Sequence, residues 1–146
     1  MPDYAKQLRR AVLPRTKADY GITALIPPAS QYPTTVPASR TLPFSRYGVP
    51  VLTPLTATGL DSSSVRFAIN AFMVPKTNTA GAALVTAEDM ACDIGSAIKD
   101  CLNGAVLILE SGMKATITWL STTPRQDPDE ADAWATTVSF KADIAG

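Results

Sequence analysis

The sequence predicts an α+β fold, a largely antiparallel sheet of about four to five strands with helices packed on one face. Three observations predict it: an alternating strand at 65–72, an amphipathic helix at 87–102, and three strand-like runs after that helix. The chain has 146 residues, of which 46% are hydrophobic, so it can bury one core and is too short for two ordinary ones. We therefore expect a single domain over 1–146.

Residues 1–26 are expected to form a broken helical unit. A first helix is predicted over 4–13, because apolar side chains recur every four positions after Asp3, at Tyr4, Leu8 and Val12. Pro14 is expected to end this helix or to begin a new first turn. A second helical piece is predicted over 15–26, stopped by Pro27 and Pro28.

Residues 27–62 are expected to form a proline-rich extended arm. Seven prolines fall in this segment, at positions 27, 28, 33, 37, 43, 50 and 54. Proline cannot donate a hydrogen bond to a sheet, so a strand over 44–55 is expected only at an edge or a bulge. A long segment without a buried pattern indicates a binding role, and we expect neighbouring molecules to order it.

Residues 63–146 are expected to form the strand–helix–three-strand core. The strand at 65–72 places Val65, Phe67, Ile69 and Ala71 on one face, and residues 76–83 read as a loop. Thr86 is a candidate N-cap for the helix, and Gly104 is placed to end it. Strands are then predicted over 105–110, 113–120 and 133–142, with hairpin connections.

The two cysteines, Cys92 and Cys101, lie nine positions apart in the predicted helix. That spacing separates them by about 180° of rotation and about 13 Å of rise. A disulfide requires Cα atoms within about 7 Å, so the two residues cannot pair with each other in that helix. We expect Cys101 in the core and Cys92 as a thiol on the opposite face, as in a reducing compartment.

The charges are balanced overall and divided along the chain. Residues 1–73 carry eight basic and three acidic side chains, whereas residues 74–146 carry five and ten. Either both sets are solvated, or copies of the chain dock a basic face on an acidic face. No apolar run approaches the ~20 residues of a membrane-spanning helix, and the N-terminus lacks the apolar core of a signal peptide, so a cytosolic protein is expected.

Catalytic chemistry has little support in this sequence. It contains no histidine, which removes the commonest general base and transition-metal ligand. The glycines form no phosphate-binding or dinucleotide-binding pattern. We therefore predict no catalytic residue, cofactor or metal, and classify the chain as a non-enzyme.

One acidic cluster lies in the stretch RQDPDEADAW, and its members are Asp127, Asp129, Glu130 and Asp132. A calcium loop would need a third ligand and a glycine where Ala131 and Asp132 stand, so its match to that pattern is weak. Thr123-Pro124 and Asp127-Pro128-Asp129 favour a turn instead. The turn is the preferred interpretation, and a carboxylate-based metal module or enzyme stays the distant alternative. Trp119 and Trp134 are expected to anchor the two ends of this hairpin in the core.

In this order, the elements resemble a known family, the tail terminator or tail completion proteins of long-tailed bacteriophages and gene transfer agents. The resemblance covers most of the chain and rests on several motifs: LRRAVLPRTKAD, ITALIP, YPTTVPASRTLPFSRYGVPVLTP, VRFAINAF, AEDMACDIGSAIKDCLNG, and the final hairpin from QDPDEADAW into VSFKADI. Ala135 departs from the pattern, since many relatives are expected to have histidine there.

The resemblance implies a structural virion protein, assembled in the host cytoplasm, that forms a ring, typically a hexamer. Such a ring would cap the head-proximal end of the tail tube, stop tube polymerisation and join the tail to the head connector or stopper. DNA would pass through its channel without sequence-specific binding, and no membrane is involved. Another neck or tail-tube protein is the nearer alternative. Candidate interface residues are Arg40, Arg46 and Tyr47 with the four acids of the 127–132 cluster.

Overall fold

The computed structural model describes residues 4–33, 35–40, 42–48, 51–54, 63–74, 76–77, 83–126 and 133–145. The helices in these residues are α1 (Tyr4–Ala18), α2 (Tyr20–Thr23), the short 3-10 helix η1 (Pro28–Ser30) and α3 (Ala87–Leu102). The strands are β1 (Gln31–Tyr32), β2 (Phe44–Tyr47), β3 (Val51–Pro54), β4 (Ser63–Met73), β5 (Lys76–Thr77), β6 (Ala83–Val85), β7 (Val106–Ile108), β8 (Lys114–Gln126) and β9 (Trp134–Ala145). The predicted α+β class is confirmed.

Seven strands of the described residues form one sheet, in the order β1-β2-β4-β9-β8-β7, with β3 also paired to β4. All pairs are antiparallel except β1 with β2. The sheet is therefore larger than the four to five strands predicted. The additional strands come from the proline-rich segment, where β1 is too short to show alternation and the predicted edge strand at 44–55 is divided into β2 and β3.

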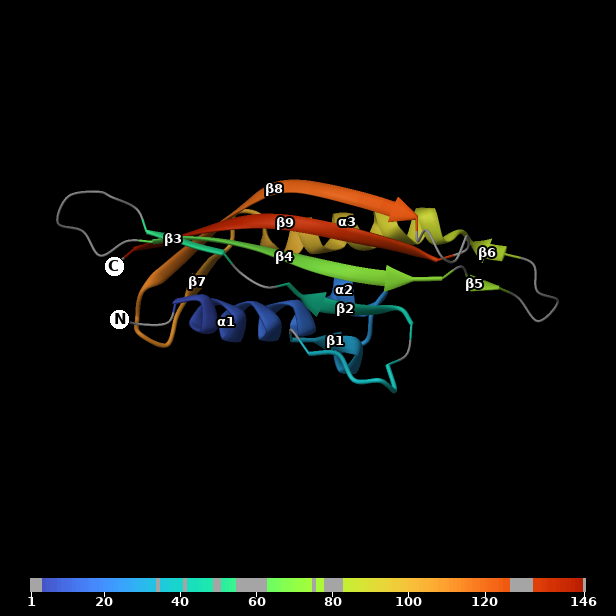
Figure 1. Cartoon of the computed structure of the whole chain (residues 1–146), viewed down its shortest axis with the longest axis horizontal. Coiled ribbons are helices and arrows are strands. Elements are labelled where there is room, and N and C mark those ends of the chain that lie inside the picture. The colour runs from blue at the N-terminus through green and yellow to red at the C-terminus, as the bar shows by residue number, and fades with distance from the viewer. Residues whose placement is uncertain are drawn as a thin grey trace.

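The long strands β4, β9 and β8 bury one face only. On β9, the buried side chains alternate with half-buried ones and include Val138, Phe140, Ala142 and Ile144. They pack with the inward-facing residues of β4 and with α3, which Figure 1 shows running behind β8 and β9. Because the sheet buries a single face, the opposite face of these strands remains available to solvent or to partners.

Helix α3 has the predicted boundaries. The hydroxyl of Thr86 accepts a hydrogen bond from the Asp89 backbone N–H at 3.1 Å, which caps the first turn. Gly104 follows the helix with φ of 79°, a left-handed conformation that glycine adopts without strain. At Gly95 the helix approaches the sheet so closely that an added Cβ would lie 2.9 Å from Cγ2 of Thr122.

The N-terminal helix continues through Pro14 without interruption, whereas the sequence predicted that Pro14 ends this helix or begins a new first turn. Its buried residues form a single row at every fourth position, Tyr4, Leu8, Val12 and Thr16. An interior proline costs about 3 kcal/mol, and burial of Leu8 and Val12 at about 1.5–3 kcal/mol each offsets that cost. The helix instead breaks at Asp19, which has extended backbone and accepts a hydrogen bond from the Ile22 N–H at 3.0 Å.

The C-terminal hairpin is longer than predicted. Strand β8 continues to Gln126, so Pro124 lies within the strand opposite Thr136 and is not part of the turn. Strand β7 covers only residues 114–116 of β8, and no other described strand pairs with that edge of β8 at Pro124, where a hydrogen-bond donor is therefore not required. Residues 127–132, the predicted turn, lie outside the described residues.

The two tryptophans are half-buried against the core. Trp119 lies opposite Phe140, well inside the hairpin, whereas Trp134 lies opposite Gln126 at its end. The prediction that Trp119 anchors one end of the turn is therefore wrong. Its indole N–H donates to the Thr122 hydroxyl at 2.9 Å.

Residues 76–83, predicted as a loop, include β5 and the start of β6, which pair as a separate two-stranded sheet.

The cysteines occupy the predicted environments, with Cys92 exposed and Cys101 buried. Burial, followed by the nearby Asp19 carboxylate, raises the pKa of the Cys101 thiol to about 11.

We expect a thiol reagent at pH 8 to modify one cysteine rapidly in the folded protein and the second only after unfolding. Peptide mapping should identify the fast site as Cys92; rapid modification of Cys101 would contradict the packing of α3.

We predict that Gly95→Val destabilises the protein by about 1–3 kcal/mol, because the new side chain overpacks the contact between α3 and the sheet. Ser96→Val is the matched control, since it places the same β-branched residue at an exposed position of the same helix. Urea denaturation followed by circular dichroism measures both free energies of unfolding. Equal losses in the two variants would show that the close approach has no energetic effect.

Candidate functional site

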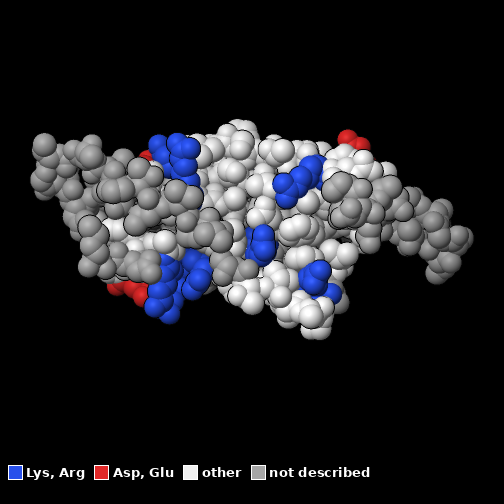
Figure 2. Space-filling view, in the orientation of Figure 1, with Lys and Arg blue, Asp and Glu red and all other residues white. Residues whose placement is uncertain are grey.

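The face of the sheet that no described helix covers is the candidate site. Along β4, Arg66, Asn70 and Phe72 alternate with buried residues and so share this outer face. The register places the β9 residues Thr137, Ser139, Lys141 and Asp143 on the same face. Figure 2, in the orientation of Figure 1, shows Lys and Arg side chains distributed over this side of the molecule, with few acidic ones among the described residues.

Two cations lie directly opposite each other on this face. Arg66 on β4 pairs with Lys141 on β9 in the antiparallel register. Like charges in directly opposite positions are destabilising. Asp143 compensates in part, since its carboxylate lies 3.6 Å from the Lys141 ammonium. Arg66 has no ion-pair partner within the described residues, which makes this part of the face attractive to an external carboxylate or phosphate.

Arg46 adds a third cation on the same face. It lies on β2 opposite Asn70, whose side-chain oxygen is already occupied by the Thr137 hydroxyl at 2.7 Å. The Nε of Arg46 is buried and finds no hydrogen-bond acceptor in the part of the chain that the structure describes. A buried donor without an acceptor is costly. The Arg46 side chain as a whole is half-buried, so its positive charge can still attract an incoming acidic group.

One end of the outer face is aromatic. Phe44 stacks on Phe72 with ring centroids 4.9 Å apart, and Tyr32 tilts against Phe44 at 6.1 Å. The guanidinium of Arg40 lies 5.5 Å from the centroid of Phe44, a distance at which a cation is attracted to the ring. Arg40 is thereby positioned over the outer face, close to the connection between β1 and β2.

The other end of this face is apolar. Val106 and Ile108 on β7 are 53% and 61% exposed, and they lie opposite Thr116 and Lys114 of β8. Exposed β-branched side chains on an edge strand are a common feature of surfaces that bind partners. The outer face thus combines an aromatic end, a basic centre and an apolar end.

The structure places the predicted interface residues in different environments. Arg40 and Arg46 both lie on the outer face. Tyr47 does not, and its prediction as an interface residue is corrected: it is 1% exposed and its ring stacks on Phe67 at 5.3 Å in the core. Its position on β2, one residue after Arg46, turns it toward the helices, and burial raises the pKa of its phenol above the ordinary value.

The four predicted acids Asp127, Asp129, Glu130 and Asp132 lie outside the described residues, so their pairing with Arg40 or Arg46 stays a prediction. Sequence reasoning missed Arg66 and Lys141 as site residues. Alternation alone would have placed each of them on the outer face, but their juxtaposition depends on the β4–β9 register.

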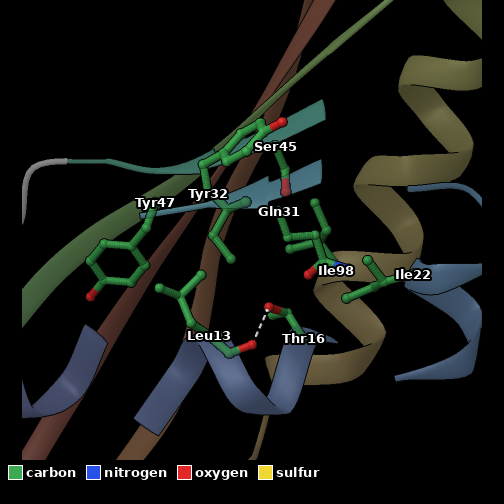
Figure 3. A pocket seen from close by; sticks show the side chains of 9 residues that line it. Leu13, Thr16, Ile22, Gln31, Tyr32, Ser45, Tyr47 and Ile98 are labelled. Carbon is green, nitrogen blue, oxygen red and sulfur yellow. Dashed lines mark hydrogen bonds between the residues drawn. The ribbon is translucent and has the colours of Figure 1, made fainter. Parts of the chain in front are cut away.

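A small cavity lies between the helices and the start of the sheet (Figure 3). It is lined by residues such as Leu13, Thr16, Ile22, Ser45 and Tyr47, and its volume of about 10 Å³ is the space of one water molecule. The Thr16 hydroxyl donates to the Leu13 carbonyl at 3.0 Å rather than into the cavity. This space is too small for an organic substrate, so the cavity is a packing feature.

The described residues offer neither a metal site nor a membrane-spanning helix. No three His, Cys, Asp or Glu side chains of the described residues are grouped so as to hold a metal ion. None of the helices in the described ranges has both the length and the apolar character to cross a membrane. The outer sheet face therefore remains the candidate site.

Comparison with known proteins relates the chain to a family and to solved structures. The model of the family described as tail completion protein gp17 matches residues 10–144. A chain of the solved structure titled "Virion of native gene transfer agent (GTA) particle" is similar over the full length of both chains, at 20% identity and a TM-score of 0.78. That likeness shows a shared fold. No curated protein matched the chain.

Proposed function

We propose that this chain, which belongs to the tail completion protein gp17 family, caps the head-proximal end of a phage-type tail tube and joins it to the head connector. The observation that carries the proposal is the family match over nearly the whole chain. The fold shared with a chain of a gene transfer agent virion supports a place in the virion. The role is structural: the chain stops tube-subunit addition by covering the tube end.

A homohexameric ring is the form in which one small chain can cover such an end. Head-to-tail contacts between copies produce a closed ring when the rotation between neighbours closes. In this arrangement the tail-tube protein contacts one side of the ring, and the connector or stopper contacts the other. DNA passes through the central channel without sequence-specific contacts, in keeping with the zero formal charge of the chain.

The proline-rich segment supplies the proposed contact between subunits. Parts of it are fixed in the sheet as β1, β2 and β3, and the connection at 33–43 links two parallel neighbouring strands. Arg40 lies in this connection, over the aromatic end of the outer face. We propose that this connection reaches a neighbouring subunit or the tube when the particle assembles.

The rival in the same class is another neck or tail-tube protein, because several such proteins share an α+β ring plan. The two roles differ in stoichiometry: a tube protein repeats along the tail, whereas a terminator occurs once, at one end. The position of the chain along the tail therefore distinguishes the two roles.

We expect the purified chain to stop the elongation of tail tubes assembled from the tube protein of the same particle. Inhibition should require amounts comparable to the number of tube ends, far below the number of tube subunits. Negative-stain electron microscopy with a gold-labelled affinity tag should show label at one end of each tube. Label repeated along the tube would identify a tube protein and overturn the proposal; an inert protein at equal mass is the control.

Replacing residues 35–40 with a Gly/Ser segment of equal length should weaken ring formation by at least tenfold in protein concentration, while the monomer stays folded. Replacement is preferred to deletion, because Tyr32 lies opposite Arg46 in the parallel β1–β2 pair and a shorter connection would separate these strands. Light scattering measures oligomer size, and circular dichroism checks the fold. A second variant that replaces 35–39 and keeps Arg40 distinguishes the contribution of the segment from that of the Arg40 charge. If the ring is unchanged in both variants, residues 35–40 do not contribute to the interface.

A further inference from the structure

A second charged surface lies on the solvent side of α3. Four acidic residues, Glu88, Asp89, Asp93 and Asp100, are exposed on this helix. Asp89, Asp93, Ser96 and Asp100 recur at intervals of three to four positions, so they form one stripe along the helix, which is here called the α3 acidic stripe. Lys99 does not neutralise it, because the Lys99 ammonium lies 4.0 Å from the centre of the Trp119 ring.

The α3 acidic stripe and the basic centre of the outer sheet face lie on opposite sides of the molecule. Helix α3 packs its apolar side on β4, β8 and β9, and the outer face is the other side of the same strands. The ion pairs found among the described residues are Arg10 with Glu110 and Lys141 with Asp143. Neither the stripe nor Arg46 and Arg66 is neutralised within these residues.

We infer that the basic outer face of one subunit receives the α3 acidic stripe of the next subunit. This inference rests on the proposed ring and specifies which surfaces form it. The chain has 13 basic and 13 acidic residues, so one copy carries both members of the complementary pair. A surface evolved for a polyanion would instead leave the chain with an excess of basic residues.

The dimensions of the two surfaces agree. Arg46 lies opposite Asn70, four residues from Arg66 on β4, so the two arginines are separated by roughly 13 Å along the strands. The stripe from Asp89 to Asp100 spans roughly 16 Å of helix. Figure 1 shows α3 and the long strands extending along the same long axis of the molecule. A helix stacked on the outer face in that direction places carboxylates along the row of cations.

The contact is heterologous, since each subunit contributes a different surface to each of its two neighbours. Such contacts form a ring when the rotation between subunits closes, and a filament when it does not. Arg46, half-buried on the outer face, adds its positive charge to this contact. The exposed apolar side chains of β7 extend the contact beyond the charged centre.

Charge reversal tests this inference. Arg66→Glu should raise the concentration at which the oligomer dissociates by at least tenfold, and so should Asp93→Arg. The double variant should recover to within about threefold of wild type, because every interface then holds the pair in reversed order. Lys17→Glu changes an exposed lysine of α1 by the same net charge and should have no effect. Analytical ultracentrifugation measures the oligomer; an oligomer insensitive to both single reversals, or a wild type that stays monomeric, would overturn the inference.

Crosslinking provides a test that is independent of stability. Cys92 is exposed on α3 beside Asp93, and Ser139 lies on the outer face at the centre of β9. Ser139→Cys should form disulfide-linked ladders longer than a dimer on mild oxidation, because each subunit carries both partners. The Cys92→Ser/Ser139→Cys variant should lose the ladder. Ladders that persist in this variant, or their absence in Ser139→Cys, would place the contact elsewhere.

Nucleic acid is the other ligand that a basic face could attract. Fluorescence anisotropy with a labelled DNA duplex should show no binding by wild type at 0.15 M salt. Binding that is lost in Arg66→Glu, with the oligomer unchanged, would overturn the inference in favour of a phosphate-binding face.

If the chain caps tubes but its oligomer is insensitive to charge reversal, the inference fails and the proposed function stands. If charge reversal acts as expected but tubes keep growing, the proposed function fails.

Discussion

The structure depends on the pairing of β9 with β4 on one side and β8 on the other. This strand is hydrogen-bonded along almost its whole length to both neighbours. Its inward side chains are fully buried beneath the helices, with Val138, Phe140, Ala142 and Ile144 all at 0% exposure. A slip of one residue in either pairing would turn these side chains to solvent. The register is therefore fixed by burial, and helices α1 and α3 pack against the face that it defines.

The same constraint determines the opposite face. Once the apolar residues of β4 and β9 face the helices, Arg66 and Lys141 must face outward, and the register places them opposite each other. The fold keeps an unfavourable cationic pair because the favourable burial on the inner face cannot be separated from it. The outer face is consequently a basic surface, and α3 displays carboxylates on the other side of the same strands, which is why we infer that the two surfaces meet in neighbouring copies.

This arrangement suits the assembly role of a structural virion protein. The described cavity holds about one water molecule, whereas the outer face is long and charged, and no helix of the described residues covers it. In the proposed ring, the two complementary sides of this chain would contact neighbouring copies, and its rims would stay available to two different partners. Charge complementarity would mainly set the orientation and register of such contacts, with apolar groups such as Val106 and Ile108 adding burial.

The sequence alone determined the elements with strong local signals. The alternation at 65–72, the capped amphipathic helix from Thr86 to Gly104 and the separation of the two cysteines all follow from spacing within one segment, and the structure has them as predicted. Tertiary structure decided what depends on contacts between distant segments. Helix α1 continues through Pro14 because its buried row packs on the rest of the chain, and Pro124 lies in a strand because no described strand pairs with that edge of β8 there. Tyr47 faces the core and Arg66 meets Lys141 because strand register, set by the burial of the whole inner face, is a property of the sheet and not of any one segment.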